Sequence, residues 1–154
     1  MKKITLLLLV IGTMSTSAFL FFNFKKNKES REYSKTIYIK DLDPKSFITI
    51  CKQRYNKTAF NTVTMSGEFP DNWVKTNDIE YLISIMHSKE KCCGYTNIFS
   101  SSVSSQDAEV GGFAIIFLNS YMNKTKINLG LNNYPKTNEE SIRKIENWYK
   151  TVQK

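Results

Sequence analysis

The stretch EVGGFAIIFLNSYMN, residues 109–123, is apolar around nearly the whole circumference of a helix. Ile115 and Ile116 add apolar faces to a set of residues that recurs at helical spacing. That set is Val110, Phe113, Ala114, Phe117, Leu118 and Tyr121. A helix of this kind is usually buried between other elements. The sequence therefore predicts a central helix over residues 109–122, with Gly111 and Gly112 allowing another segment to approach its start closely.

Three amphipathic helices are expected around this central helix. Each begins with a recognisable N-terminal signal, which is an N-cap followed by proline in the first and a capping box in the other two. These signals are Asp43 with Pro44, Asn77 with Glu80, and Thr137 with Glu140. The predicted buried sides are Phe47, Ile50, Cys51 and Tyr55; Ile79, Leu82, Ile83 and Met86; and Ile142, Ile145, Trp148, Tyr149 and Val152.

Extended structure is expected to be minor. Residues 37–39 form a short extended piece, and residues 57–70 end in Gly67 and Pro70, which favours a loop or a short β-hairpin. At 154 residues the chain has room for one domain with a real core. The sequence thus predicts a mainly α protein, with an N-terminal membrane-targeting helix followed by a small helical domain over residues 37–154.

The N-terminal residues 4–24 carry no charge, and they are numerous enough for a helix to cross the hydrocarbon core of a bilayer. Lys2 and Lys3 precede an apolar run and then small polar residues, as in a secretory signal peptide cleaved after Ala18. Residues 19–22 continue the apolar run, and the lysines that follow indicate a retained anchor instead. Both interpretations place residues 1–24 in a membrane, whereas a buried core helix is the less favoured alternative.

Residues 25–36 are basic and weakly hydrophobic, which predicts a flexible tether attracted to anionic lipid head groups. The positive-inside rule alone would favour a cytoplasmic domain, because Lys25, Lys26, Lys28 and Arg31 outnumber Lys2 and Lys3. The short N-terminal signal favours export instead. We therefore expect the protein in the cell envelope, anchored by a single span or exported after cleavage. Lipid contact is the simplest explanation of the net charge of +8. The other lysines are scattered among acidic residues, so no nucleic-acid partner is expected.

An ordered series of residues extends over roughly positions 69–150. It consists of Trp73-Val74-Lys75, Asp78-Ile79, Leu82-Ile83, Ser88, Cys92, Ser101-Ser102, Val110-Gly111-Gly112, Tyr121 and Trp148. This series resembles the pattern of a family of small uncharacterised bacterial proteins. The resemblance implies a bacterial origin and a helical module, and it implies no particular activity. Cys93 and the long serine run depart from the family pattern around its single cysteine.

The three cysteines, Cys51, Cys92 and Cys93, are the candidate reactive residues. An odd number permits at most one intramolecular disulfide, which in an oxidising envelope would join Cys51 to Cys92 or to Cys93. Free and buried cysteines are the preferred alternative, because cysteine is also a common small core residue. The sequence leaves both the redox state and the choice of partner open.

A metal-binding or catalytic role for these cysteines lacks the necessary companion residues. Zinc requires four ligands at workable spacing, and the chain offers one histidine, His87, and two adjacent cysteines. His87 is also the only imidazole that could activate a Cys92 or Cys93 nucleophile. The sequence therefore predicts no catalytic residue, no metal site and no cofactor.

The serine run at residues 100–105 precedes the central helix. It predicts a loop in which Ser104 or Ser105 caps that helix, because serine favours turns and N-caps. In the functional alternative, the hydroxyls line a polar pocket and the helix start at Gly111 and Gly112 receives an anion.

These patterns lead to three hypotheses for the function. The leading one is an envelope-associated, non-catalytic binding or protein-interaction module, because well-patterned helices occur without a catalytic set. The second is an immunity-type or inhibitory protein that captures a partner protein. The third is a cysteine-dependent enzyme that uses Cys92 or Cys93 with His87. The reactivity of the thiols discriminates the third hypothesis from the other two.

Overall fold

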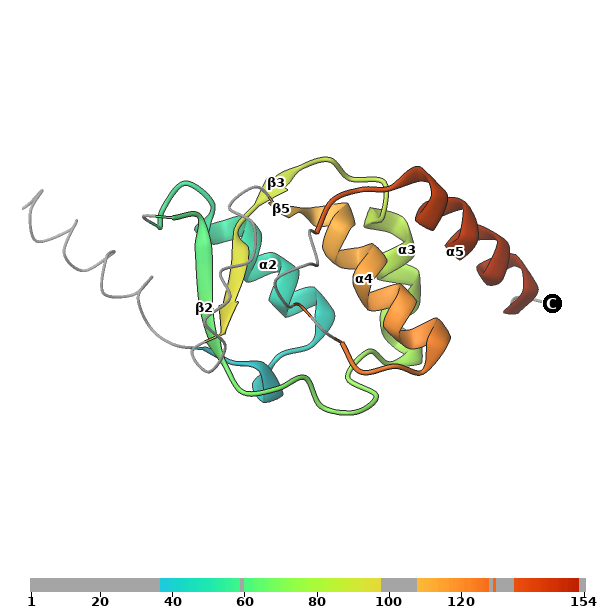
Figure 1. Cartoon of the computed structure of the whole chain (residues 1–154), viewed down its shortest axis with the longest axis horizontal. Helices are drawn as coiled ribbons and strands as arrows, with labels where there is room; N and C mark the ends of the chain where they lie inside the picture. Colours follow the sequence, from blue (N-terminus) through green and yellow to red (C-terminus); the bar gives the residue numbers. More distant parts are fainter. Residues whose placement is uncertain (1–36, 59, 98–107, 128, 130–134, 153–154) are drawn as a thin grey trace, which may run out of the picture. The chain divides into compact units, whose positions relative to one another are not determined.

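Strands as well as helices build the domain, as the computed structural model shows (Figure 1). It describes residues 37–58, 60–97, 108–127, 129 and 135–152, all of which belong to the compact unit Thr36–Lys154. The predictions for residues 1–24, for residues 25–36 and for the serine run at 100–105 lie outside the described residues. Of the helices that are described, none combines the length and the apolarity that a bilayer crossing requires.

Strands and helices alternate along the first half of the domain. The helices are α2 (Pro44–Arg54), α3 (Ile79–Ile85), α4 (Val110–Asn123) and α5 (Glu139–Val152), with the 3-10 turns η1 (Ile39–Asp41) and η2 (Thr76–Asp78). The strands are β1 (Ile37–Tyr38), β2 (Thr62–Ser66), β3 (Lys91–Cys92), β4 (Gly94–Asn97) and β5 (Ala108–Glu109). An alternation of this kind is typical of parallel sheets with helical connections.

A three-stranded parallel sheet has the strand order β1-β2-β4. Ile37 is in register with Met65, and Val63 is in register with Tyr95. The chain passes through α2 between β1 and β2 and through α3 between β2 and β4, because parallel strands require a long crossover. A separate antiparallel ladder joins β3 to β5.

The prediction of a mainly α fold is therefore wrong, and the domain is a mixed α/β structure. Residues 57–70 contain β2, the central strand of the sheet, in which Val63 and Met65 have no exposed surface. Strands of two to five residues carry too little periodicity to be recognised locally. The partners of β2 also come from distant parts of the chain, so the sequence around it gives no signal of the pairing.

Phe47 of α2 lies at the centre of the core. Its ring centroid is 5.2 Å from that of Phe113 and 5.4 Å from that of Phe117, both on α4. On another side it lies 6.3 Å from the ring of Tyr95 on β4. Such edge-to-face and tilted pairs add to the free energy gained from burial alone. Most residues of α4 are buried, and α2 packs against both the sheet and α4. These observations confirm the prediction that α4 is a central buried helix.

The start of α4 packs tightly against two other segments. A Cβ atom on Gly111 would collide with the carbonyl oxygens of Met86 and Ser88. A Cβ atom on Gly112 would collide with the backbone of residues 135–136. The predicted close approach at these two glycines is thus confirmed, and it explains why neither position holds a side chain.

The predicted start of α2 is confirmed, whereas the two predicted capping boxes are wrong. Asp43 accepts a hydrogen bond of 2.7 Å from the N–H of Ser46, and Pro44 is the first residue of α2. The 3-10 turn η2 precedes α3, and it is Asp78 that accepts a hydrogen bond of 2.8 Å from the N–H of Lys75. The added turn moves the N-terminal signal away from the predicted pair Asn77 and Glu80.

The cap of α5 is shifted by one residue from the prediction. Asn138 accepts a hydrogen bond of 2.9 Å from the N–H of Ser141. Thr137 does not cap the helix, because it donates its N–H and its hydroxyl to Glu109. On the inner side of α5, the prediction is wrong for Val152, which is 62% exposed.

Candidate functional site

The three cysteines converge where the end of α2 meets β3 and β4. Cys51, Cys92 and Cys93 have no exposed surface, and all three are free thiols. The N–H of Cys93 donates a hydrogen bond of 3.0 Å to the carbonyl of Cys51. The sulfur of Cys93 also lies 3.8 Å from the hydroxyl oxygen of Thr58. The structure thus brings together the residues that the sequence identifies as candidates.

Burial raises the pKa of all three thiols. The pKa of Cys92 rises to about 12, first through burial and then through the nearby Cys93 and Glu90. The pKa of Cys51 is raised well above its usual range by burial and by the other two cysteines. For Cys93, burial raises the pKa while the hydrogen bond with Thr58 opposes that rise. Because the thiolate is the nucleophilic form, these cysteines are weak nucleophiles at neutral pH.

His87 follows α3 and is exposed. Its Nε2 lies 3.2 Å from Oε1 of Glu146 on α5, so the imidazole is paired with a carboxylate and not with a thiol. Within the residues that the structure describes, no three His, Cys, Asp or Glu side chains are grouped so as to hold a metal ion.

The start of α4 is occupied by the protein itself. The N–H of Val110 donates to the carbonyl of Glu90 at 3.0 Å, and the N–H of Gly111 donates to the carbonyl of Ser88 at 2.9 Å. Gly112 is covered by the backbone of residues 135–136. The alternative in which the backbone of these glycines receives an anion is therefore wrong, since no space is left for one.

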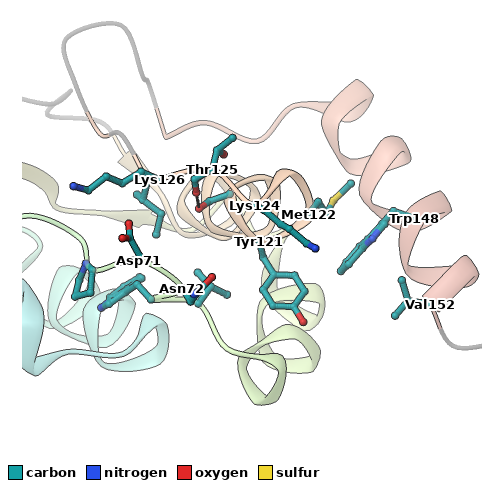
Figure 2. A pocket seen from close by; sticks show the side chains of 14 residues that line it. Asp71, Asn72, Tyr121, Met122, Lys124, Thr125, Lys126, Trp148 and Val152 are labelled. Carbon is teal, nitrogen blue, oxygen red and sulfur yellow. Dashed lines mark hydrogen bonds between the residues drawn. The ribbon is translucent and has the colours of Figure 1, made fainter.

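A groove with a volume of about 570 Å³ opens between α5, the end of α4 and the segment before η2 (Figure 2). We call it the α5 groove. It is lined by Pro70, Asp71, Asn72, Trp73, Val74, Ser120, Tyr121, Met122, Lys124, Thr125, Lys126, Ile127, Trp148 and Val152. Three separate segments of the chain thus form its walls.

Two aromatic side chains define one end of the α5 groove. Trp148 projects from α5 toward Tyr121 at the end of α4 (Figure 2), and their ring centroids are 6.0 Å apart. Both are half-buried. The hydroxyl of Tyr121 lies 3.0 Å from the hydroxyl of Thr76, which fixes the position of the ring. Met122 lies beside them and adds a flexible apolar surface.

Charged side chains define the rest of the groove. Lys126 forms an ion pair of 2.5 Å with Glu68, and Asp71 adds to the electrostatic effect that raises the pKa of Lys126. Lys124 is the C-cap of α4, with a φ of 50° in the left-handed region. It is exposed, and its ammonium group has no hydrogen bond or ion pair with the described residues. The groove therefore combines an apolar end with a lysine that forms no ion pair with the described part of the chain.

The sequence pattern does not reveal this groove. Helical spacing assigns Tyr121 and Trp148 to the inner sides of their helices, and both side chains are indeed half-buried. It does not show that α5 leaves part of that side uncovered. Two aromatic residues near helix ends, with lysines in the connection after α4, are the one signal in the sequence.

Comparison of the chain with protein-family models, with curated proteins and with solved structures gives no match. The resemblance to small bacterial proteins therefore stays a prediction. The function has to be inferred from the geometry of the domain itself.

Proposed function

We propose that this protein is an envelope-associated, non-catalytic binding module that holds a segment of a partner protein in the α5 groove. The observation that carries the proposal is the placement of Tyr121, Trp148 and the exposed Lys124 around one groove. Tryptophan and tyrosine are among the residues that most often dominate the binding free energy of protein interfaces.

The apolar end of the groove favours an apolar side chain of the partner. Val152 is 62% exposed at the groove edge, next to the half-buried indole of Trp148. Covering such surface contributes about 25 cal/mol for each Å² of apolar area removed from water. A large aliphatic or aromatic residue of the partner would supply that cover.

The open shape of the groove favours a stretch of polypeptide over a small molecule. Much of the lining is exposed, namely Pro70, Asp71, Asn72, Lys124, Thr125, Lys126 and Val152. Sites for small molecules usually enclose most of the ligand surface, which such a lining does not do. An extended segment needs only one of its sides against the groove.

The charges favour an acidic residue in that segment. Lys126 is already neutralised by Glu68, whereas Lys124 has no carboxylate partner among the described residues. A carboxylate of the partner, next to its apolar residue, would complement Lys124 and fix the register of the segment.

The thiol cluster supports a non-catalytic function. Cys92, the cysteine of the enzyme hypothesis, has a pKa raised to about 12 by burial, and Cys93 is also buried. The only histidine of the chain contacts Glu146. Neither observation fits a cysteine that is activated by an imidazole.

A peptide library tests the binding function directly. The full chain in detergent would be used to select from random peptides displayed on phage. We expect enrichment of sequences with an aromatic or large aliphatic residue near Asp or Glu. With a synthetic peptide of the enriched sequence, Trp148→Ala should weaken binding by roughly 30-fold and Lys124→Glu by roughly 10-fold.

Two matched variants serve as controls for this experiment. Asn147→Ala removes an exposed side chain of α5, and Lys150→Glu reverses an exposed charge there. Neither residue lines the groove. Both should leave the affinity within roughly twofold. Equal binding by the Trp148→Ala variant, or selection without any enrichment, would contradict the proposal.

The envelope location rests on the uncharged segment at residues 4–24 and needs a separate test. Cells that express a tagged full chain would be fractionated, and the N-terminus of the recovered protein would be sequenced. A protein that begins after Ala18 indicates cleavage, and an intact N-terminus in the membrane fraction indicates an anchor. An intact chain in the cytoplasmic fraction would overturn the envelope part of the proposal.

A further inference from the structure

The backbone contact between Cys51 and Cys93 fixes the distance between the two residues. Near the end of α2, the N–H of Tyr55 donates to the carbonyl of Lys52 and not to that of Cys51. The carbonyl of Cys51 accepts the N–H of Cys93 instead, at 3.0 Å. A backbone hydrogen bond of this length keeps the two Cα atoms within about 7 Å of each other. Disulfides span Cα separations of about 4.4–6.8 Å, so this distance is suitable for one.

A contact between α2 and β4 lies close to the two cysteines in the sequence of each segment. Phe47 precedes Cys51 by four positions and lies on the same face of α2. Cys93 immediately precedes β4, and Tyr95 is the second residue of that strand. The rings of Phe47 and Tyr95 are in contact, with centroids 6.3 Å apart. Cys51 and Cys93 are the next pair along this helix–strand contact.

We propose that Cys51 and Cys93 form a disulfide when the folding chain meets a disulfide-bearing oxidant, while Cys92 stays a buried thiol. The thiolate of Cys93 attacks one sulfur of the oxidant, forms a mixed disulfide and releases the first thiolate of the oxidant. Cys51 then loses its proton and attacks the sulfur of Cys93, which releases the second thiolate. The two electrons and the two protons of the protein thiols pass to the reduced oxidant.

Cys92 is the competing partner for Cys51. After burial, the charge of Cys92 raises the pKa of Cys51 more than the charge of Cys93 does, so Cys92 belongs to the same cluster. Cys93 has the advantage in the first step, because Thr58 and Arg54 oppose the rise in its pKa and leave it more thiolate. The backbone hydrogen bond to Cys51 gives it the advantage in the second step.

Refolding in an oxidant tests this assignment. The full chain would be unfolded in denaturant, refolded in detergent with oxidised glutathione, alkylated and digested with trypsin without reduction. We expect the peptide of residues 46–52 to be linked to the peptide of residues 92–124. The link should persist in Cys92→Ala and disappear in Cys93→Ala, and fragmentation of the linked wild-type peptides should locate the bond at Cys93.

Thermal unfolding provides an independent readout. A link that closes a loop of about 40 residues should raise the Tm of the oxidised chain by about 5–15 °C relative to the reduced chain. The Tm of Cys93→Ala should not respond to reductant, whereas that of Cys92→Ala should respond like the wild type. Three free thiols after refolding, or a bond between Cys51 and Cys92, would overturn the proposal.

Discussion

Thr137 donates two hydrogen bonds to one carboxylate oxygen of Glu109, from its N–H at 2.9 Å and from its hydroxyl at 2.7 Å. The backbone N–H of Glu109 in turn donates to the carbonyl of Pro135 at 2.7 Å. Lys91 and Lys136 lie 3.4 Å and 3.8 Å from the other oxygen of Glu109. One acidic side chain thus joins the start of α4 to the segment that leads into α5.

Replacing this carboxylate should lower the stability of the domain. Hydrogen bonds to charged groups are stronger than those between neutral groups, so Glu109→Gln should reduce the free energy of unfolding by about 1–2 kcal/mol. Urea denaturation of the two proteins near neutral pH measures this difference. An exposed pair provides the control, because Glu68→Gln breaks an ion pair whose side chains are both solvent-exposed and should lower the stability much less than Glu109→Gln does.

The same carboxylate should make stability depend on acid pH. The pKa of Glu109 in the folded protein is lowered to about 2 from its usual 4.5, first by the backbone N–H of Thr137. The unfolded chain therefore takes up this proton at higher pH than the folded chain. The stabilisation is fully present above about pH 4.5 and is lost as the pH falls toward about 2. The free energy of unfolding, measured by urea denaturation at several pH values in this range, should depend less on pH in Glu109→Gln than in the wild type. An equal pH dependence in the two proteins would contradict the role of Glu109.

The two glycines at the start of α4 should not tolerate a methyl group. At Gly112 the added Cβ would collide with the backbone of residues 135–136, which cannot move without displacing α5, so Gly112→Ala should cost about 3 kcal/mol. Gly67 is a useful contrast, because its φ is +93° but no atom lies within 4 Å of an added Cβ. Gly67→Ala should cost about 1–2 kcal/mol through backbone strain alone. Equal losses in chemical denaturation would mean that the contact at Gly112 is not rigid.

The position of the α5 cap gives a direct comparison between the sequence pattern and the structure. Asn138→Ala should lower the free energy of unfolding by about 1 kcal/mol, because the N–H of Ser141 loses its acceptor. Glu140→Ala should change it by less than about 0.5 kcal/mol, since Glu140 is exposed and does not close a capping box. The reverse order of these two effects would restore the predicted cap at Thr137.

The helices of this domain are largely predictable from the sequence because each carries its own local signal. The proline at position 44 and the apolar circumference of α4 suffice to locate two of them. The caps of α3 and α5 are displaced because side chains near them have alternative partners. Thr137, in particular, bonds to Glu109 from a different element, and this choice depends on tertiary contacts that no local pattern contains.

The sheet and the sites depend on contacts between distant residues, so they are not predictable in this way. The residue pair Val63 and Tyr95 defines the centre of the sheet, and nothing near either residue indicates the other. The sequence does identify the three cysteines as a group of interest, but not that Cys51 meets Cys93. The α5 groove cannot be predicted from the sequence for a related reason. It is formed by the part of the inner helix faces that the packing of the domain leaves uncovered.

The reduced protein should show three slow thiols. A pKa of about 12 against a usual value of 9.0 lowers the thiolate fraction of Cys92 about a thousandfold at neutral pH. Because the folded-state pKa of Cys92 is raised, its buried thiol stabilises the folded chain fully below about pH 9, and this stabilisation is lost as the pH rises toward about 12. Labelling with a maleimide should therefore be much slower than labelling of free glutathione, with Cys93 reacting first, and denaturant should expose all three thiols. In Cys93→Ala, only the two slowest thiols should remain. A thiol in the folded wild type that reacts as fast as glutathione would instead support a nucleophilic cysteine, and with it the enzyme hypothesis.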